Sequence, residues 1–242
     1  MPNRTDKCQR KIAILQSCYL PWKGYFDIIG SVDVFVVYDD VQFDLHGWRN
    51  RNRVKSPNGP HWLTVPVRHT GLGKRMIHEI EIDNRLPWGR KHLGTIRQFY
   101  AKAPFVDRYL PELAGILSRG WERLVALDLA LTELMCSWLH LQRRVVLSSQ
   151  LGIQGERSER LLHLCLHFGA TRYLSGDAAK EYLDVQLFAE RGITVAWQEY
   201  DHPVYPQLHG EFVSHLSALD LVLNCGGESD RILAGQETRE KK

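Results

Sequence analysis

Two short apolar runs near the start of the chain constrain its fold more than any other feature. Lys11–Gln16 and Asp33–Tyr38 are rich in branched aliphatic residues, and both are followed by polar residues. Between them, Tyr25–Gly30 has the apolar spacing of a short helix, and Gly30 is suited to end it. A strand, a helix and a second strand in this order predict a right-handed βαβ unit with two parallel, buried strands.

The same alternation returns in the last third of the chain. Apolar runs predict strands at Arg144–Leu147, Tyr173–Gly176 and Ile193–Trp197. The intervening segments Ser158–Phe168 and Ala178–Glu190 predict helices, with Ser158 as a cap of the first. The sequence therefore predicts an α/β fold with a Rossmann-like, open and mostly parallel sheet, covered by helices on both faces.

The middle of the chain interrupts this pattern. Residues 87–143 are predicted to be mostly helical, with interruptions at Pro104 and Pro111, and His61–Val67 and Ile77–Ile82 are predicted strands. We expect one α/β domain over residues 11–235 with a helical insertion at 87–143, flanked by disordered tails at 1–10 and 236–242.

Composition narrows the class of protein. The chain has 242 residues, of which 44% are hydrophobic and 24% are charged, which is ordinary for a globular protein. The net charge of +3 gives little attraction to a polyanion, so we expect no nucleic-acid partner. No apolar run reaches the roughly 20 residues of a membrane helix, and the polar start does not resemble a secretory signal. The 5 cysteines include no C-x-x-C pair, which favours free thiols. We expect a soluble, cytoplasmic protein with no membrane insertion.

Polar residues at the ends of the predicted strands indicate where a ligand would bind. In open parallel sheets, ligands bind beyond the carboxyl ends of the strands, where these ends lie along one edge. We therefore expect substrate-binding side chains directly after the apolar runs. The candidates of this kind are Gln16, Tyr19, Asp39, Gln42 and Ser175.

Two of the candidate catalytic residues also follow strands. Cys18 lies close to a predicted helix N-terminus, where a thiolate nucleophile would be stabilised, although a free cysteine is also a common small core residue. Asp40 is a candidate general base. Because Asp39 and Asp40 are adjacent and point to opposite sides, at most one of them faces a site, and the other reading for either is a turn or capping role.

The segment from Trp48 to Lys55 is rich in arginine and asparagine. Arginine suits phosphate groups, and asparagine suits hydroxyl and amide groups. We predict that Arg49, Asn50, Arg51 and Asn52 bind substrate, the alternative being a solvated loop.

Histidines supply the remaining candidates. His202 lies in a segment stiffened by two prolines, so we predict that it acts as a base while Tyr205 and Gln207 orient the acceptor. The alternative is a structural loop that covers a sheet edge. His163 and His167 share a helix face, but no glutamate completes a zinc motif, so we predict no metal site.

Several blocks of the sequence closely resemble the WbqC-like family. The blocks cover nearly the whole chain, from Lys11 to about Leu233. They are Ile14–Ile29, Tyr38–Phe43, Trp48–Asn52, Tyr173–Gly176 with Tyr182–Asp184, Tyr200–Gln207 and Leu216–Asn224.

The resemblance implies a place in bacterial surface-polysaccharide biosynthesis, chiefly of the O-antigen of lipopolysaccharide. It implies an enzyme, a transferase that moves an acyl or aminoacyl group, such as glycyl, onto an amino sugar. The expected substrate is a small sugar or sugar nucleotide. The sequence demands no cofactor. This chemistry implies only an acyl donor, coenzyme A or the thioester of a carrier protein, which would make an acyl-carrier protein a partner.

A second resemblance concerns the fold alone. The opening strand, the segment Pro21–Tyr25 and the strand to Asp39 look like the start of HxGH nucleotidylyltransferases and pantothenate synthetases, which have a HUP-like fold. Trp22 and Tyr25 stand where those enzymes have histidines, and neither supplies a cation. A nucleotidyltransferase or ligase is therefore one alternative function, and a non-catalytic sugar-nucleotide-binding protein is another.

Overall fold

The structure, a computed structural model, describes residues 9–68 and 75–235. These residues form two compact units. Unit 1 comprises the described residues up to 16 together with 28–38 and 143–200, and unit 2 comprises 17–27, 201–235 and the described residues between 39 and 142. The predicted single domain over 11–235 stays a prediction. The predicted tails fall outside the described residues, apart from residues 9 and 10.

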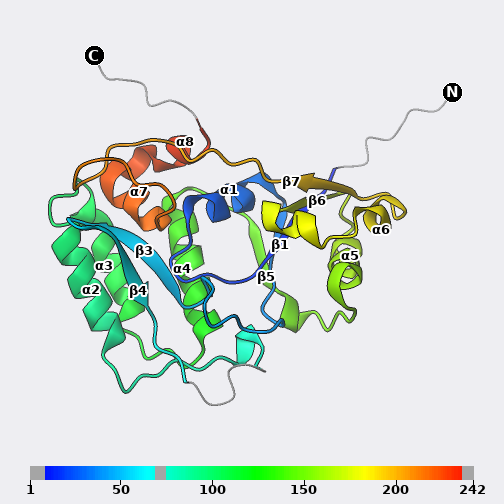
Figure 1. The fold of residues 1–242 in the computed structure, drawn as a ribbon, viewed down its shortest axis with the longest axis horizontal. Coiled ribbons are helices and arrows are strands. Elements are labelled where there is room, and N and C mark those ends of the chain that lie inside the picture. Colours follow the sequence, from blue (N-terminus) through cyan, green and yellow to red (C-terminus); the bar gives the residue numbers. More distant parts are fainter. Residues whose placement is uncertain (1–8, 69–74, 236–242) are drawn as a thin grey trace. The chain divides into compact units, whose positions relative to one another are not determined.

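Unit 1 is built on a five-stranded sheet in the order β5–β2–β1–β6–β7. All neighbouring strands are parallel. The order reverses between β1 and β6, so these two strands flank the topological switch point. This sheet, with helices around it, confirms the predicted α/β, Rossmann-like fold (Figure 1). The strands are β1 (Lys11–Leu15), β2 (Val34–Val37), β5 (Arg144–Leu147), β6 (Arg172–Ser175) and β7 (Thr194–Trp197).

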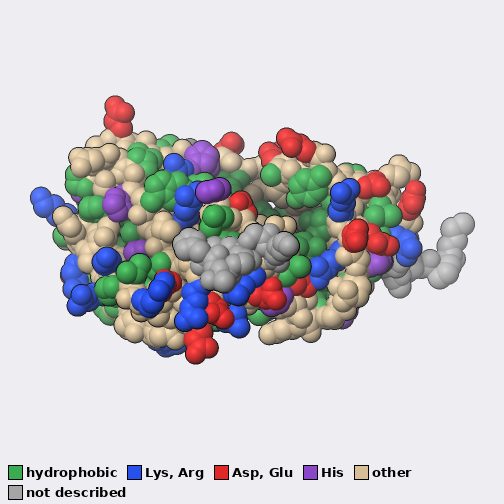
Figure 2. Space-filling model, turned by 60° about the horizontal axis from the view of Figure 1, so that its bottom comes forward, with side chains coloured by type: hydrophobic (Ala, Val, Ile, Leu, Met, Phe, Trp, Pro, Cys, Tyr) green, Lys and Arg blue, Asp and Glu red, His purple; other side chains and the backbone are tan. Residues whose placement is uncertain are grey.

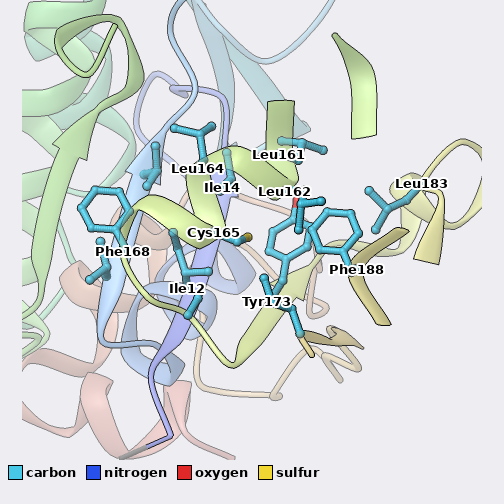
Figure 3. Close-up of a cluster of buried hydrophobic side chains, with 14 of the residues drawn as sticks. Ile12, Ile14, Leu161, Leu162, Leu164, Cys165, Phe168, Tyr173, Leu183 and Phe188 are labelled. Atoms are coloured by element: carbon cyan, nitrogen blue, oxygen red, sulfur yellow. The ribbon is translucent and has the colours of Figure 1, made fainter. Parts of the chain in front are cut away.

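The core of unit 1 lies on one face of this sheet. Alternate residues of β1 and β2 point to that face, where helices α5 (Arg157–His167) and α6 (Val185–Ala189) add apolar side chains. The rings of Tyr173 and Phe188 stack there, with centres 5.4 Å apart (Figure 3). Each large apolar side chain buried in this way contributes about 1.5–3 kcal/mol relative to exposure.

The helix predicted over Ala178–Glu190 is broken in the structure. A 3-10 helix, η4 (Asp177–Glu181), precedes α6, and Asp184 caps α6 by accepting a hydrogen bond from the backbone N–H of Leu187 at 3.3 Å. A local cap therefore outweighs helix continuity. The predicted cap at Ser158 is also wrong, because its hydroxyl accepts a hydrogen bond from the N–H of Asp184 at 2.9 Å while Glu156 takes the cap position.

Unit 2 combines an antiparallel hairpin with helices. Strands β3 (Arg51–Ser56) and β4 (Gly59–Thr64) pair, and α2, α3 and α4 lie side by side next to them (Figure 1). The basic segment predicted as a site or a solvated loop is thus largely a strand. The helices of this unit are α2 (Trp88–Phe99), α3 (Val106–Leu117), α4 (Leu124–Trp138), α7 (Ala218–Cys225) and α8 (Ser229–Leu233).

The remaining elements are short. Helix α1 (Lys23–Ser31) begins in unit 2 and ends in unit 1. The 3-10 helices η3 (Ser148–Gln150) and η5 (Gly226–Glu228) follow β5 and α7.

Two predictions for the middle of the chain are wrong. Ile77–Ile82 is not a strand. Its first half forms a 3-10 helix, η2 (Ile77–Glu79), in which the side chain of Glu79 turns back to accept the N–H of Met76 at 2.8 Å, and Glu81 and Ile82 form isolated β-bridges. Pro111 lies inside α3 rather than interrupting it. No helix of the described ranges is long and apolar enough to cross a membrane.

Candidate functional site

Unit 2 contains a pocket of about 290 Å³. Three of its lining residues, Cys18, Arg49 and His202, are predicted site residues. The other three were not predicted. They are Trp22, Trp48 and His215.

The loop before α1 forms one side of the pocket, and asparagine holds it in place. The side-chain amide of Asn52 donates to the backbone carbonyls of Tyr19 at 3.2 Å and Leu20 at 2.8 Å. Leu20 has a φ of +43°, a left-handed conformation that is unfavourable for leucine. The bonds from Asn52 offset this strain and fix the loop that carries Cys18 and Trp22. The predicted role of Asn52 in substrate binding stays a prediction.

Backbone hydrogen bonds join the segments that contain Trp22, Arg53 and Ser217, and these segments carry further residues of the pocket. Trp22 forms an antiparallel bridge with Ser217, whose N–H donates to the carbonyl of Arg53 at 2.9 Å. His215, two residues before Ser217, has a φ of +56°. Strain of this kind costs of order 1–3 kcal/mol and tends to occur at functional sites.

Two histidines meet in the pocket. The ring centres of His202 and His215 are 3.9 Å apart, and the ring of Trp22 lies 5.5 Å from that of His202. Burial, the neighbouring His215 and the positive charge of Lys23 lower the pKa of His202 to about 4. The imidazole of His202 is therefore neutral at pH 7, and a neutral imidazole can accept a proton.

Cys18 lies in a different electrostatic setting. Burial raises the pKa of its thiol, Arg49 partly counters this effect and the carboxyl of Asp128 adds to it. Asp128 is fully buried, accepts a hydrogen bond from the hydroxyl of Ser17 at 2.7 Å, and has a pKa raised well above the usual range by burial. Cys18 is consequently a thiol at neutral pH, which does not favour a nucleophilic role.

Tyr205 and Gln207, predicted to orient a substrate, both donate to a buried carboxylate. The hydroxyl of Tyr205 lies 2.8 Å from Asp220 and the amide of Gln207 lies 2.7 Å from it. Tyr100 donates to the other oxygen of Asp220 at 2.7 Å. Sequence reasoning missed Asp220, although a carboxylate inside the apolar run of α7 was a detectable signal.

Two buried lysines border this carboxylate network. Lys23 Nζ lies 3.4 Å from the hydroxyl of Tyr205, and burial lowers its pKa to about 8. Lys55 Nζ donates to the side-chain carbonyl of Gln207 at 3.1 Å. The loop that follows His202 is thus anchored through Tyr205 and Gln207, which fixes the position of the histidine.

Arginine and tryptophan side chains lie on the outer face of the β3–β4 hairpin. The rings of Trp48 and Trp62 are 5.2 Å apart, and the guanidinium of Arg51 lies 4.6 Å from the ring centre of Trp62. Such contacts stabilise the cation by about 0.5–1 kcal/mol at exposed sites. Basic and acidic side chains are intermixed along one edge of the face shown in Figure 2.

The other predicted residues do not line the pocket. Asn50 donates its amide to the carbonyl of Val65 at 2.8 Å, and the hydroxyl of buried Tyr19 shares a hydrogen bond of 2.8 Å with His92 Nδ1. Three more fall in unit 2 with differing exposure. Asp39 is buried, Asp40 is half-buried and Gln42 is exposed.

Two predicted residues belong to unit 1. Gln16 follows β1, and Ser175 is the last residue of β6, so both mark the switch point of the sheet. Ser175 is buried and donates its hydroxyl to that of Tyr173 at 3.4 Å.

The structure also bears on metal binding. Within residues 9–68 and 75–235, no group of three or more histidine, cysteine, aspartate or glutamate side chains is placed to hold a metal ion. His163, one of the histidine pair on α5, shares a hydrogen bond of 2.9 Å with the carbonyl of Gln154.

The pocket-forming segments lie within a region that matches a known family. The model of the WbqC-like protein family matches residues 16–232. The chain belongs to the WbqC-like protein family. A WbqC-like relative in Mycobacterium tuberculosis (strain ATCC 25618 / H37Rv), "Uncharacterized protein Rv1507c", is 39% identical over 222 residues, which cover 91% of this chain and 96% of the relative. No solved structure matches this WbqC-like chain.

Proposed function

We propose that this WbqC-like protein transfers an acyl or aminoacyl group, such as glycyl, to the amino group of a sugar in bacterial surface-polysaccharide (O-antigen) biosynthesis. The observation that carries the proposal is the pocket that brings the imidazole of His202 together with the guanidinium of Arg49. Two indoles, those of Trp22 and Trp48, give the pocket flat apolar walls for a sugar ring.

His202 is the base in this mechanism. An amino sugar reaches neutral pH largely as an ammonium ion, which must lose a proton before its nitrogen can attack. His202 accepts that proton, the nitrogen forms a bond to the carbonyl carbon of a thioester, and the carbon–sulfur bond breaks. The proton on His202 then passes to the departing thiolate, and the second proton that the nitrogen loses on becoming an amide is released to water. Arg49 stabilises the negative charge that develops on the carbonyl oxygen.

The low pKa of His202 describes the pocket without substrate. Lys23 and His215 both disfavour its charged form, so an anionic group bound nearby would raise the pKa toward the working pH. An amino sugar that carries a phosphate would therefore strengthen the base as it binds.

The test is an assay for amide formation. The purified protein is incubated with amino-sugar nucleotides and with acyl or aminoacyl donors on coenzyme A or a carrier protein, and N-acylated sugar is detected by mass spectrometry. We expect His202→Gln to lower turnover by about 10²–10⁴-fold. The control His61→Gln changes an exposed histidine of the same unit and should retain turnover. Sugar binding without any amide product would instead indicate a non-catalytic sugar-nucleotide-binding protein.

A second candidate is a nucleotidyltransferase or ligase that uses the sheet of unit 1. The order of its strands places the switch point between β1 and β6, where open α/β sheets bind ligands. Gln16 and Ser175 would line that site. Binding of ATP that is lost in Ser175→Ala, together with release of pyrophosphate, would favour this candidate.

A further inference from the structure

The outer face of the β3–β4 hairpin gathers two arginines over one indole. Arg51 and Arg53 alternate along β3, so they share a face, and the register places Trp62 opposite Arg53. The guanidinium carbon of Arg51 lies 4.6 Å from the ring centre of Trp62, and that of Arg53 lies 5.5 Å from it. Arg53 also lies 5.4 Å from the ring centre of Trp48. The hairpin therefore presents two positive charges close together.

Both arginines are held in position before any ligand arrives. Arg51 donates to the backbone carbonyls of Gly47, at 3.3 Å, and His46, and Arg53 donates to that of His215 at 3.2 Å. Stacking on the indoles limits their motion further. Ordering a flexible side chain on binding costs about 0.5–1.5 kcal/mol in conformational entropy. Because Arg51 and Arg53 are already ordered, ligand binding loses less of this entropy.

Their positive charges lack a carboxylate partner. In the part of the chain that the structure describes, the ion pairs are formed by other basic residues, and neither Arg51 nor Arg53 forms an ion pair with an acidic side chain. Among the described residues, Nη1 of Arg51 and Nη1 of Arg53 have no hydrogen-bond acceptor, because the bonds of these arginines come from Nε and Nη2 of Arg51 and from Nη2 of Arg53. A guanidinium with unused donors matches the oxygen geometry of a phosphate group.

This arginine pair adjoins the pocket. Trp48, which carries Arg53 on its ring, lines the pocket, and so does His215, whose carbonyl accepts the bond from Arg53. The pocket volume of about 290 Å³ is just below the range of roughly 300–1,000 Å³ for small-molecule sites. A single sugar ring fits such a volume, and the rest of a larger substrate must lie outside it.

We propose that Arg51 and Arg53 form a subsite for the diphosphate of a diphosphate-linked sugar, whose sugar ring occupies the pocket beside His202. The sugar in the pocket rests on the proposed function, whereas diphosphate binding by the arginines does not require group transfer. A nucleoside diphosphate sugar and a lipid diphosphate sugar share this chemistry.

The test is binding, measured by titration calorimetry on the full chain with inorganic pyrophosphate and with a uridine diphosphate amino sugar. Arg51→Gln and Arg53→Gln should each weaken both ligands about 10- to 100-fold, as expected for loss of a charged hydrogen bond of about 1.5–3 kcal/mol. Arg97→Gln, which changes an exposed arginine of α2 in the same unit, should bind as the unaltered protein does. Thermal unfolding checks that each variant is folded.

Two further arms identify the ligand. Trp22→Leu should weaken the sugar diphosphate and leave pyrophosphate binding unchanged, because Trp22 lines the pocket and not the arginine subsite. Competition of pyrophosphate against the nucleotide sugar and against a short polyprenyl diphosphate sugar shows which source binds more tightly. Equal affinity of the folded arginine variants and the unaltered protein, or binding of none of these ligands, would overturn the proposal. Arginine-dependent binding without amide formation would leave the subsite intact and refute the transferase.

Discussion

The imidazole rings of His202 and His215 lie 3.9 Å apart, centre to centre, in the pocket of unit 2. At this distance His215 disfavours the protonated form of His202 and lowers the pKa of His202, because two neighbouring positive charges repel in a partly desolvated site. The backbone of His215 has a φ of +56°, which is strained for a residue other than glycine. This strained residue therefore lies next to the histidine whose pKa is lowered.

Replacing His215 should restore the basicity of its neighbour. Asparagine is chosen because it tolerates a positive φ. In His215→Asn we expect the pKa of His202 to rise from about 4 toward the ordinary value of 6.5. Burial and Lys23 continue to act, so the recovery is partial. Titration of the imidazole protons by NMR, assigned with His202→Asn, measures the change. An unaltered pKa would show that His215 has no part in the shift.

Stability should depend on pH through His92. This histidine is buried, and burial lowers its pKa from 6.5 to about 4, with a further contribution from His61 that a backbone hydrogen bond with Thr64 opposes. Between these two values the unfolded chain binds a proton that the folded protein does not. The contribution is therefore complete above pH 6.5 and is lost as the pH falls toward 4, with a limit of about 3 kcal/mol.

Urea unfolding at pH 7.5 and pH 5.0 measures this effect. The difference between the two pH values should be smaller in His92→Gln than in the unaltered protein, since other groups contribute equally to both. The same difference in both proteins would show that His92 does not couple folding to pH in this range.

Cys18 should react slowly with thiol reagents. It is 5% exposed, and its raised pKa leaves little thiolate at neutral pH. Alkylation with iodoacetamide, followed by mass spectrometry of the peptide that contains Cys18, should show protection in the native protein and rapid labelling in urea. Fast labelling of the native protein that is blocked by an acyl donor would instead make Cys18 the nucleophile.

Asp220 should matter more for folding than Lys23. Asp220→Ala leaves the donors of Tyr100, Tyr205 and Gln207 without their shared acceptor, and we expect a loss of about 3–5 kcal/mol in the free energy of unfolding. Lys23→Met removes a charge that burial itself disfavours, so we expect a change within about 1 kcal/mol. Denaturant unfolding at pH 7 compares the two, and an equal loss would mean that the attraction between Lys23 and Asp220 dominates.

Short apolar runs predicted the sheet of unit 1 well. Its central strands β1 and β2 are largely buried, and a short run of branched aliphatic residues favours a strand. Arg144–Leu147 is a strand with these bounds, and the runs around β1 and β2 differ from the structure by one residue at each end or less. The prediction failed where a nearby polar group decided the backbone, as at Asp184, which caps α6, and Glu79, which holds η2.

The candidate site divides in the same way. Cys18, Arg49 and His202 carry reactive or charged groups that the sequence displays directly, and the structure brings these three together. Trp22 and His215 were not predicted as pocket residues. Their segments are joined by the backbone bridge between Trp22 and Ser217, and the sequence around Trp22 and His215 does not indicate this long-range pairing.

Local periodicity and side-chain chemistry are enough to establish the α/β class, the parallel strands and the chemical groups available for binding. Which of these groups meet depends on the tertiary structure. In the folded protein, His202 lies against His215, and Tyr205 and Gln207 donate hydrogen bonds to Asp220. The arginines of β3 stack on tryptophan. These contacts join residues far apart in the chain, and their protonation depends on burial and neighbouring charge, which exist only in the folded protein.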